Sequence, residues 1–120
     1  IGKQYGTIKG ILWHQGESDA NEKSIPLYKE RLSELIGWFR ATAGNSSLPV
    51  LLGELGSYSN DKGNWELINK AINEYSVRDK YSAVISTAGL EHKGDSIHFD
   101  SKGQRLMGSR FAEAYLKKLK

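Results

Sequence analysis

The stretch Leu48-Pro49-Val50-Leu51-Leu52-Gly53-Glu54-Leu55 is short and almost wholly apolar, and loop-forming residues bound it on both sides. Gly44-Asn45 precedes it, and the polar segment 56–64 follows it. A short apolar run of this kind predicts a strand buried on both faces rather than a half-exposed antiparallel strand. Two similar runs, Thr7–His14 and Ser82–Thr87, predict two more strands of the same type.

Helical patterns follow each of these three runs. Their expected ranges are about Ser24–Ala43, with Ser24 as the N-cap and Pro26 in the first turn, about Asn64–Asp79, and about Ser101–Lys118, opened by a capping box of Ser101 and Gln104. Apolar residues at helical spacing give each helix one face for the sheet: Tyr28, Leu32, Leu35, Ile36 and Phe39; Trp65, Ile68, Ile72 and Tyr75; Met107, Phe111, Ala114 and Tyr115.

The order of elements is therefore strand, helix, strand, helix, strand, helix. Such alternation predicts an α/β fold with a parallel sheet and helices packed on its faces. Three strands are few for a sheet of this class, which has about five or six on average.

The composition is that of an ordinary globular chain, with 120 residues, 38% hydrophobic and 26% charged. This length allows one domain at most. The net charge of +3 comes partly from the tail Lys117–Lys120, and no basic stripe interleaved with aromatic residues predicts nucleic-acid binding. There is no cysteine, and no apolar run approaches the ~20 residues of a membrane span.

Asp95 and His98 form the first candidate site, on the loop before the last helix. A histidine can accept a proton from a nucleophile and return it to a leaving group, and an aspartate can hold the ring in one tautomer. We predict that this pair is the base half of a hydrolytic triad. The alternative on spacing alone is an ordinary turn, with Asp95 bonded to the loop and His98 partly buried.

The second candidate site, Gln15-Gly16-Glu17-Ser18-Asp19, follows the first predicted strand. Gln15 carries an amide donor and Gly16 allows close approach of the backbone, so both are candidates for an oxyanion hole. Glu17 and Ser18 are possible site residues. The alternative is a polar turn in which Glu17 and Asp19 cap backbone amides.

Other polar residues near the strand ends are expected to be structural. We predict that His14 packs or bonds locally, and that Glu54, which could contact substrate or another loop, has a structural role. Metal binding is a rival hypothesis, but the possible ligands lack a compact metal-site spacing, and we expect no metal or other cofactor: they are His14, Glu17, Asp19, His92, Asp95 and His98.

Together, the stretch from Trp13 to Asp19 and the segment Asp95-Ser96-Ile97-His98-Phe99 resemble the SGNH/GDSL hydrolase superfamily. The most similar branch contains sialate O-acetylesterases and the acetylxylan esterases of carbohydrate esterase family 6. The resemblance covers nearly the whole chain. It implies a flavodoxin-like three-layer α/β/α sandwich with a parallel sheet, removal of acetyl groups from carbohydrates, Asp95 and His98 in the triad, and the Gln15-Gly16 region in the oxyanion hole.

One departure from that pattern concerns the nucleophile. Members of the superfamily carry it in a Gly-Gln-Ser or Gly-Asp-Ser element after the first strand, near the N-terminus, and no such element stands near the start of this sequence. We therefore expect residues 1–120 to be the C-terminal portion of a single esterase domain, with the nucleophile serine and the N-terminal strands upstream of Ile1. An alternative is that Ser18 is the nucleophile, because Gly16-Glu17-Ser18-Asp19-Ala20 partly matches a Gly-x-Ser-x-Gly elbow.

The predicted function is that of a carbohydrate O-acetylesterase, and the alternative is a non-catalytic carbohydrate-binding module of the same fold. Trp13, Trp38 and Trp65 could stack on sugars, but Trp38 and Trp65 fall in predicted helices and are expected to pack. The expected partners are an acetylated carbohydrate and either the missing N-terminal segment or a second copy across an exposed sheet edge. The resemblance alone suggests a secreted or periplasmic location.

Overall fold

The computed structural model describes residues 2–59, 61 and 63–118. Its elements are η1 (Gly2–Gln4), β1 (Ile11–Trp13), η2 (Glu17–Asp19), α1 (Ile25–Ala43), β2 (Val50–Gly53), α2 (Asn64–Arg78), β3 (Ser82–Ile85) and α3 (Ser101–Lys118). The three strands form one parallel sheet in the order β1-β2-β3. The predicted α/β fold with a parallel sheet is confirmed.

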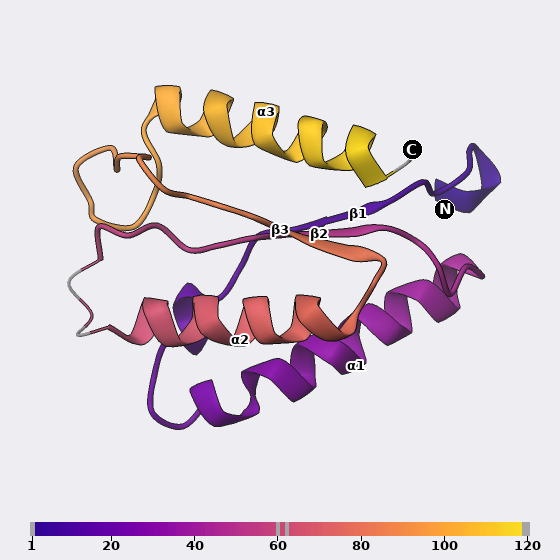
Figure 1. Ribbon diagram of the computed structural model, residues 1–120, viewed down its shortest axis with the longest axis horizontal. Coiled ribbons are helices and arrows are strands. Elements are labelled where there is room, and N and C mark those ends of the chain that lie inside the picture. Colours follow the sequence, from indigo (N-terminus) through magenta and orange to yellow (C-terminus); the bar gives the residue numbers. More distant parts are fainter. Residues whose placement is uncertain (1, 60, 62, 119–120) are drawn as a thin grey trace.

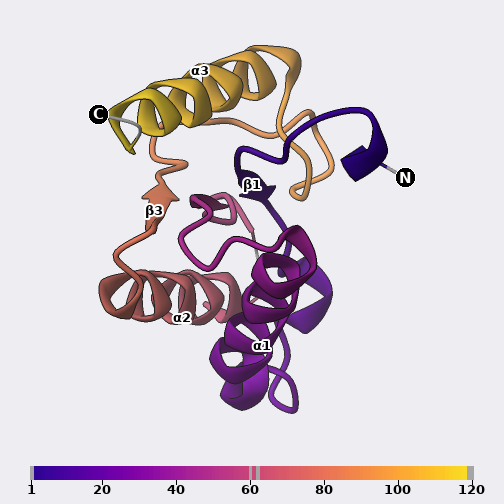
Figure 2. The same ribbon diagram turned by 90° about the vertical axis from the view of Figure 1, so that its right-hand side faces the viewer.

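The helices cover both faces of this sheet. α1 and α2 lie on one face and α3 lies on the other, so the molecule has three layers (Figures 1 and 2). β2 runs through the middle, and its residues Val50, Leu51 and Leu52 have no exposed surface. The stretch that predicts a strand buried on both faces is therefore the centre of the core.

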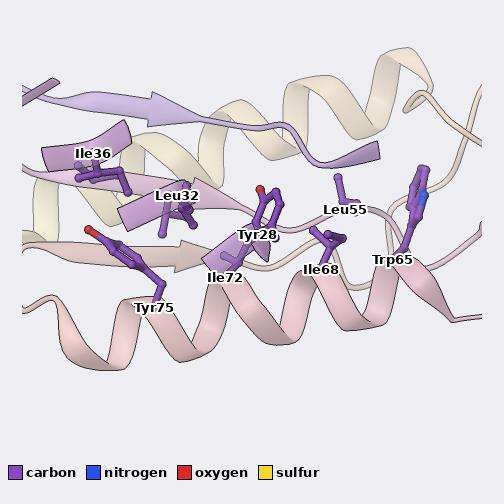
Figure 3. Close-up of a cluster of buried hydrophobic side chains, with 10 residues drawn as sticks. Tyr28, Leu32, Ile36, Leu55, Trp65, Ile68, Ile72 and Tyr75 are labelled. Atoms are coloured by element: carbon purple, nitrogen blue, oxygen red, sulfur yellow. The ribbon is translucent and has the colours of Figure 1, made fainter. Parts of the chain in front are cut away.

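The larger core cluster lies between the sheet and the pair α1 and α2 (Figure 3). Burial of one Leu or Ile side chain contributes roughly 1.5–3 kcal/mol, so this cluster holds the two helices firmly. Leu35 and Phe39, which the helical pattern also places on this face, are only half-buried. The buried members from the two helices are Tyr28, Leu32, Ile36, Trp65, Ile68, Ile72 and Tyr75.

The smaller cluster, beneath α3, is less complete. Met107 is buried, but Phe111, Ala114 and Tyr115 of the predicted stripe are only half-buried. The cause is the free outer edge of β1, which within the described part of the chain pairs with β2 alone. Leu12 on this edge is 64% exposed, and an apolar groove of about 510 Å³ remains between β1 and α3.

Several details of the sequence prediction are wrong. Ser101 and Gln104 do not form a capping box; instead the Asp100 carboxylate accepts a hydrogen bond from the Gly103 amide at 2.6 Å. Ser24 is the N-cap of α1 and Pro26 lies in its first turn, as predicted, although the Ser24 side chain makes no capping bond. Trp38 does not pack and is 67% exposed, whereas the packing predicted for Trp65 is confirmed.

The strands are shorter than their apolar runs, because a strand ends where its ladder partner ends. Residues 7–10 precede β1 without pairing, since β2 begins only at Val50. The end of α1 is as predicted: Gly44 has a φ of 70° and its amide bonds back to the Ala41 carbonyl. No helix in the described ranges is long and apolar enough to cross a membrane.

Candidate active site

A small pocket lies beside the end of the sheet at which β1, β2 and β3 give way to loops. Parallel strands place their carboxyl ends at one edge, which is why residues far apart in sequence meet here. In Figure 1 this is the end opposite η1 and the last turns of α3. The pocket has a volume of about 210 Å³ and is lined by His14, Glu17, Gly56, Tyr58, Trp65, Ile97, His98, Phe99 and Gln104.

The Asp95 carboxylate and the His98 ring form a hydrogen-bonded pair, with Asp95 Oδ2 2.6 Å from His98 Nδ1. The other oxygen, Asp95 Oδ1, accepts bonds from the backbone amides of Ile97 at 2.9 Å and His98 at 2.8 Å. The bond from the His98 ring, then these two amide bonds, hold the pKa of the Asp95 carboxyl well below its usual range. Asp95 is therefore ionised at neutral pH and can only accept.

That ionisation decides which nitrogen of His98 carries the proton. Because the Asp95 carboxylate can only accept, His98 Nδ1 must donate, and the neutral ring has an unprotonated Nε2. Within the described residues Nε2 has no hydrogen-bond partner. The His98 side chain is 63% exposed, so this basic nitrogen is open to a reactant. The predicted pairing of Asp95 with His98 is present.

A hairpin formed by residues 91–100 presents this pair. Its base is closed by the bond from the Asp100 amide to the Glu91 carbonyl at 3.0 Å and an antiparallel bridge between His92 and Phe99. The Phe99 side chain is buried in the core beneath α3. The hairpin is thus anchored at its base, with Asp95 at its tip.

The two predicted oxyanion residues lie after β1 but do not line the pocket. The Gln15 side-chain amide donates to Asp19 Oδ2 at 2.8 Å, and the Gly16 amide donates to Glu17 Oε2 at 3.0 Å. A Cβ atom at position 16 would lie 2.7 Å from Ile68 Cγ2. The close approach that Gly16 permits is therefore to the core, and the oxyanion role of both residues stays a prediction.

Glu17 and Ser18 lie in η2 and have different surroundings. Glu17 lines the pocket, and its carboxylate already accepts the Gly16 amide. Ser18 does not line the pocket, and its carbonyl accepts a bond from Asn21. No serine hydroxyl in the described part of the chain hydrogen-bonds to the His98 ring.

His14 and Glu54 have the local contacts expected of structural residues. The His14 ring stacks on Phe99 with centroids 5.4 Å apart, and its Nε2 lies 3.0 Å from the Glu54 carbonyl oxygen. The Glu54 carboxylate accepts a bond from Asn73 at 2.9 Å. Among residues 2–59, 61 and 63–118, no three His, Asp or Glu side chains are grouped so as to hold a metal ion.

Tyr58 and Gln104 line the pocket but carry no recognisable sequence signal. Tyr58 comes from the loop after β2, and its hydroxyl donates to the Ile97 carbonyl at 3.1 Å. Burial, followed by the nearby carboxylates of Asp95, Glu17 and Asp100, raises the pKa of Tyr58 to about 12. Only the tertiary fold brings this phenol to the hairpin formed by residues 91–100.

Known proteins are similar to this chain in sequence and in fold. A family model described as carbohydrate esterase, sialic acid-specific acetylesterase, matches residues 1–117. A probable carbohydrate esterase of Arabidopsis thaliana is 31% identical over 114 residues, which are 92% of this chain and 41% of that protein. Its crystal structure superposes with a TM-score of 0.83 at 28% identity, covering 96% of this chain and 47% of the plant chain.

A carbohydrate acetylesterase from Xanthomonas citri also superposes on this chain, with a TM-score of 0.65 at 27% identity over 87% of this chain and 24% of that chain. The chain thus spans less than half the length of these relatives. The resemblance found in the sequence is confirmed. The chain belongs to the carbohydrate esterase family of the sialic acid-specific acetylesterases.

Proposed function

We propose that this chain supplies the base half of the active site of a carbohydrate O-acetylesterase of SGNH type. The observation that carries the proposal is the 2.6 Å bond between Asp95 and His98 Nδ1, with His98 Nε2 exposed beside a pocket. Family membership supports an acetyl ester of a carbohydrate as the substrate.

In the proposed reaction a serine hydroxyl attacks the carbonyl carbon of the acetyl group. His98 Nε2 takes the hydroxyl proton and then gives it to the departing sugar oxygen, which leaves an acetyl-serine. A water molecule then attacks this ester, His98 takes its proton, and acetate leaves as the serine is restored. Asp95 stabilises the imidazolium formed in both steps.

The serine that attacks belongs, in this proposal, to a segment preceding Ile1 in the complete gene product. Two features support a missing contribution at this place. The pocket of about 210 Å³ is smaller than the ~300–1,000 Å³ usual for small-molecule sites. The relatives are more than twice as long as the part this chain matches.

The same segment would cover the free edge of the sheet. β1 has an unpaired outer side, and the groove beside it is lined by apolar surface of Leu12, Phe111 and Tyr115. An uncovered strand edge next to an apolar groove favours association with further chain. A strand docked parallel to β1 would place its carboxyl end, and a serine there, at the same edge as His98.

The test is to label the nucleophile in the complete gene product. A fluorophosphonate reacts with a serine only where a neighbouring base activates it, and mass spectrometry of the peptides then locates the adduct. We expect one labelled serine upstream of Ile1 and release of acetate from O-acetylated sialic acid or acetylxylan. Labelling and acetate release should both disappear in His98→Ala and persist in Glu91→Gln, which changes an exposed residue of the same hairpin.

Other results would replace the proposal. An adduct on Ser18 would establish the elbow alternative. Binding of acetylated sugars without an adduct or acetate release would instead indicate a carbohydrate-binding module. Labelling that persists in His98→Ala would remove His98 from the mechanism.

A further inference from the structure

His92 lies in the hairpin formed by residues 91–100 and bonds to the backbone of that hairpin. His92 Nδ1 is 3.0 Å from the Gly94 amide nitrogen and 3.0 Å from the Ser96 amide nitrogen. A backbone amide can only donate, so Nδ1 must be the acceptor in both bonds. These bonds therefore exist only when Nδ1 carries no proton, and the proton of the neutral ring is on Nε2.

The two amides held by His92 belong to the part of the hairpin with unusual backbone. Gly94 has a φ of 115° and Ser96 has a φ of 57°. Ser96 is the only non-glycine residue with a positive φ in the described ranges, and L residues other than glycine, asparagine and aspartate adopt this left-handed conformation only against a steric cost. Asp95 lies between Gly94 and Ser96. The His92 ring therefore bonds to the backbone on both sides of the proposed catalytic carboxylate.

We propose that His92 is a positioning residue for the esterase reaction: as a neutral imidazole it holds the Gly94–Ser96 turn in the conformation that places Asp95 against His98. The inference rests on the proposed function, because it concerns the geometry of the same catalytic pair. Protonation of His92 Nδ1 turns the acceptor into a donor and removes both bonds to the turn.

The surroundings of the ring leave few other groups that change charge with it. Tyr58, from the loop after β2, packs its ring 5.0 Å from the His92 ring, and burial raises its pKa to about 12, so it stays neutral. On the hairpin itself the neighbouring titratable groups are Lys93, Asp95 and His98, and Lys93 Nζ lies 3.7 Å from Asp95 Oδ2. Glu91 and Asp100 close the base, and Glu17 faces Tyr58 from η2.

Two substitutions test whether the turn needs a hydrogen-bond acceptor at the place of His92 Nδ1 or only a side chain of similar size. In His92→Asn, Oδ1 can occupy the place of Nδ1 and accept from both amides, and it cannot be protonated. In His92→Gln, the amide lies one bond farther from the backbone and cannot reach them. His92→Asn should retain kcat within about threefold, while His92→Gln should lower kcat by roughly 10- to 100-fold with KM little changed, because a misplaced catalytic group costs that much.

The pH profile gives a readout that a purely structural role would not move. Imidazoles take up protons as the pH falls from about 8 to 5. In His92→Asn both bonds to the turn are kept and there is no Nδ1 to be protonated, so the turn stays in place at acid pH. We expect log kcat/KM to fall less steeply with decreasing pH in His92→Asn, and superimposable normalised profiles would overturn the proposal.

A measurement independent of activity completes the test in the complete gene product. Imidazole ¹⁵N shifts, assigned by the loss of the His92 signals in His92→Asn, should show an unprotonated Nδ1 and a protonated Nε2 at pH 8. The Gly94 and Ser96 amide signals should move as the ring takes up its proton. A proton on Nδ1 at pH 8 would overturn the role of His92, whereas these shifts without any esterase activity would leave it standing and defeat the proposed function instead.

Discussion

Asp79 and Asp95 lie on either side of β3 in the sequence, and each carboxylate accepts several hydrogen bonds. Asp79, at the end of α2, accepts from Arg40 Nη1 at 2.7 Å and from the Tyr75 hydroxyl at 2.6 Å. Asp95 accepts from the His98 ring and two amides. Burial would raise the pKa of the Asp79 carboxyl, but the hydrogen bonds from Arg40 and Tyr75 lower it below its usual value. The hydrogen bonds from His98 and Ile97 lower the pKa of the Asp95 carboxyl.

The two aspartates differ in the partner and in its exposure. The Arg40 and Asp79 side chains are 13% and 10% exposed, against 63% and 33% for His98 and Asp95. A guanidinium keeps its proton at any physiological pH, whereas an imidazole exchanges one near neutrality. The Asp79 carboxylate therefore links the end of α2 to α1 through Arg40. The Asp95 carboxylate, in contrast, has a partner that can exchange a proton.

The volume of the nearest pocket does not distinguish Asp79 from Asp95. The depression beside Asp79, between α1, α2 and the start of β3, has a volume of about 830 Å³, and the pocket beside His98 has about 210 Å³. In the larger one, Arg40 is already paired with Asp79. An unpaired basic nitrogen at the carboxyl ends of the strands, such as His98 Nε2, indicates a candidate site better than pocket volume does.

The largest effect is expected at the proton-exchanging partner. In the complete gene product, His98→Ala should lower kcat/KM for an acetyl ester by about 10³-fold or more, because no other group takes the nucleophile's proton. The free energy of unfolding should be unchanged, since the ring is exposed. A variant retaining a tenth of the wild-type rate would place the base elsewhere, and Glu91→Gln serves as the control.

Asp95→Asn should have the next largest effect. The asparagine can still accept from the Ile97 and His98 amides through Oδ1, but its nitrogen donates towards His98 Nδ1 and favours the tautomer that cannot act as a base. We expect a large loss in kcat from the wrong tautomer, smaller than the loss for His98→Ala because the ring itself remains. Stopped-flow or steady-state assays measure it, and a loss in thermal stability in place of a loss in kcat would make Asp95 structural like Asp79.

Asp79→Asn should have the opposite profile. Removing one partner of a largely buried ion pair leaves Arg40 without its counter-charge, and we expect a loss of about 2 kcal/mol in the free energy of unfolding. The rate per folded molecule should be that of the wild type. Denaturant titration checks the first statement, with the exposed Glu113→Gln as the control, and a changed kcat in the folded fraction would contradict the second.

The smallest effect concerns acid. The pKa of Asp79 is lower in the folded chain than in the unfolded one, so its ionised form stabilises the fold above the ordinary aspartate range near pH 3.9. That contribution is lost as the pH falls through the lowered folded pKa. Asp79→Asn should therefore show a shallower loss of stability between about pH 5 and pH 2 than the wild type. Parallel curves would show that other carboxyls account for the acid sensitivity.

The sequence predicts the strands, the helices and the pairing of Asp95 with His98 well, because each depends on residues close together in the chain. Asp95 and His98 are three residues apart, so one turn brings them into contact. The details that the sequence predicts wrongly depend on contacts with residues far away along the chain. Trp38 has an apolar ring and a helical position, yet its neighbours leave it exposed, and the half-buried state of Phe111 follows from the open edge of β1.

By itself, the sequence determined the α/β order, the buried central strand and the chemistry available at His98, because apolar runs and short spacings act locally. Only the tertiary structure decided that Tyr58 reaches the hairpin of residues 91–100, that the amides of Gln15 and Gly16 are bonded to carboxylates, and that His92 accepts bonds from the Gly94 and Ser96 amides. Tyr58 reaches the hairpin because the carboxyl ends of separate strands converge at one edge. Which amide finds which acceptor is set by side-chain direction and packing, and residue spacing along the chain does not encode these.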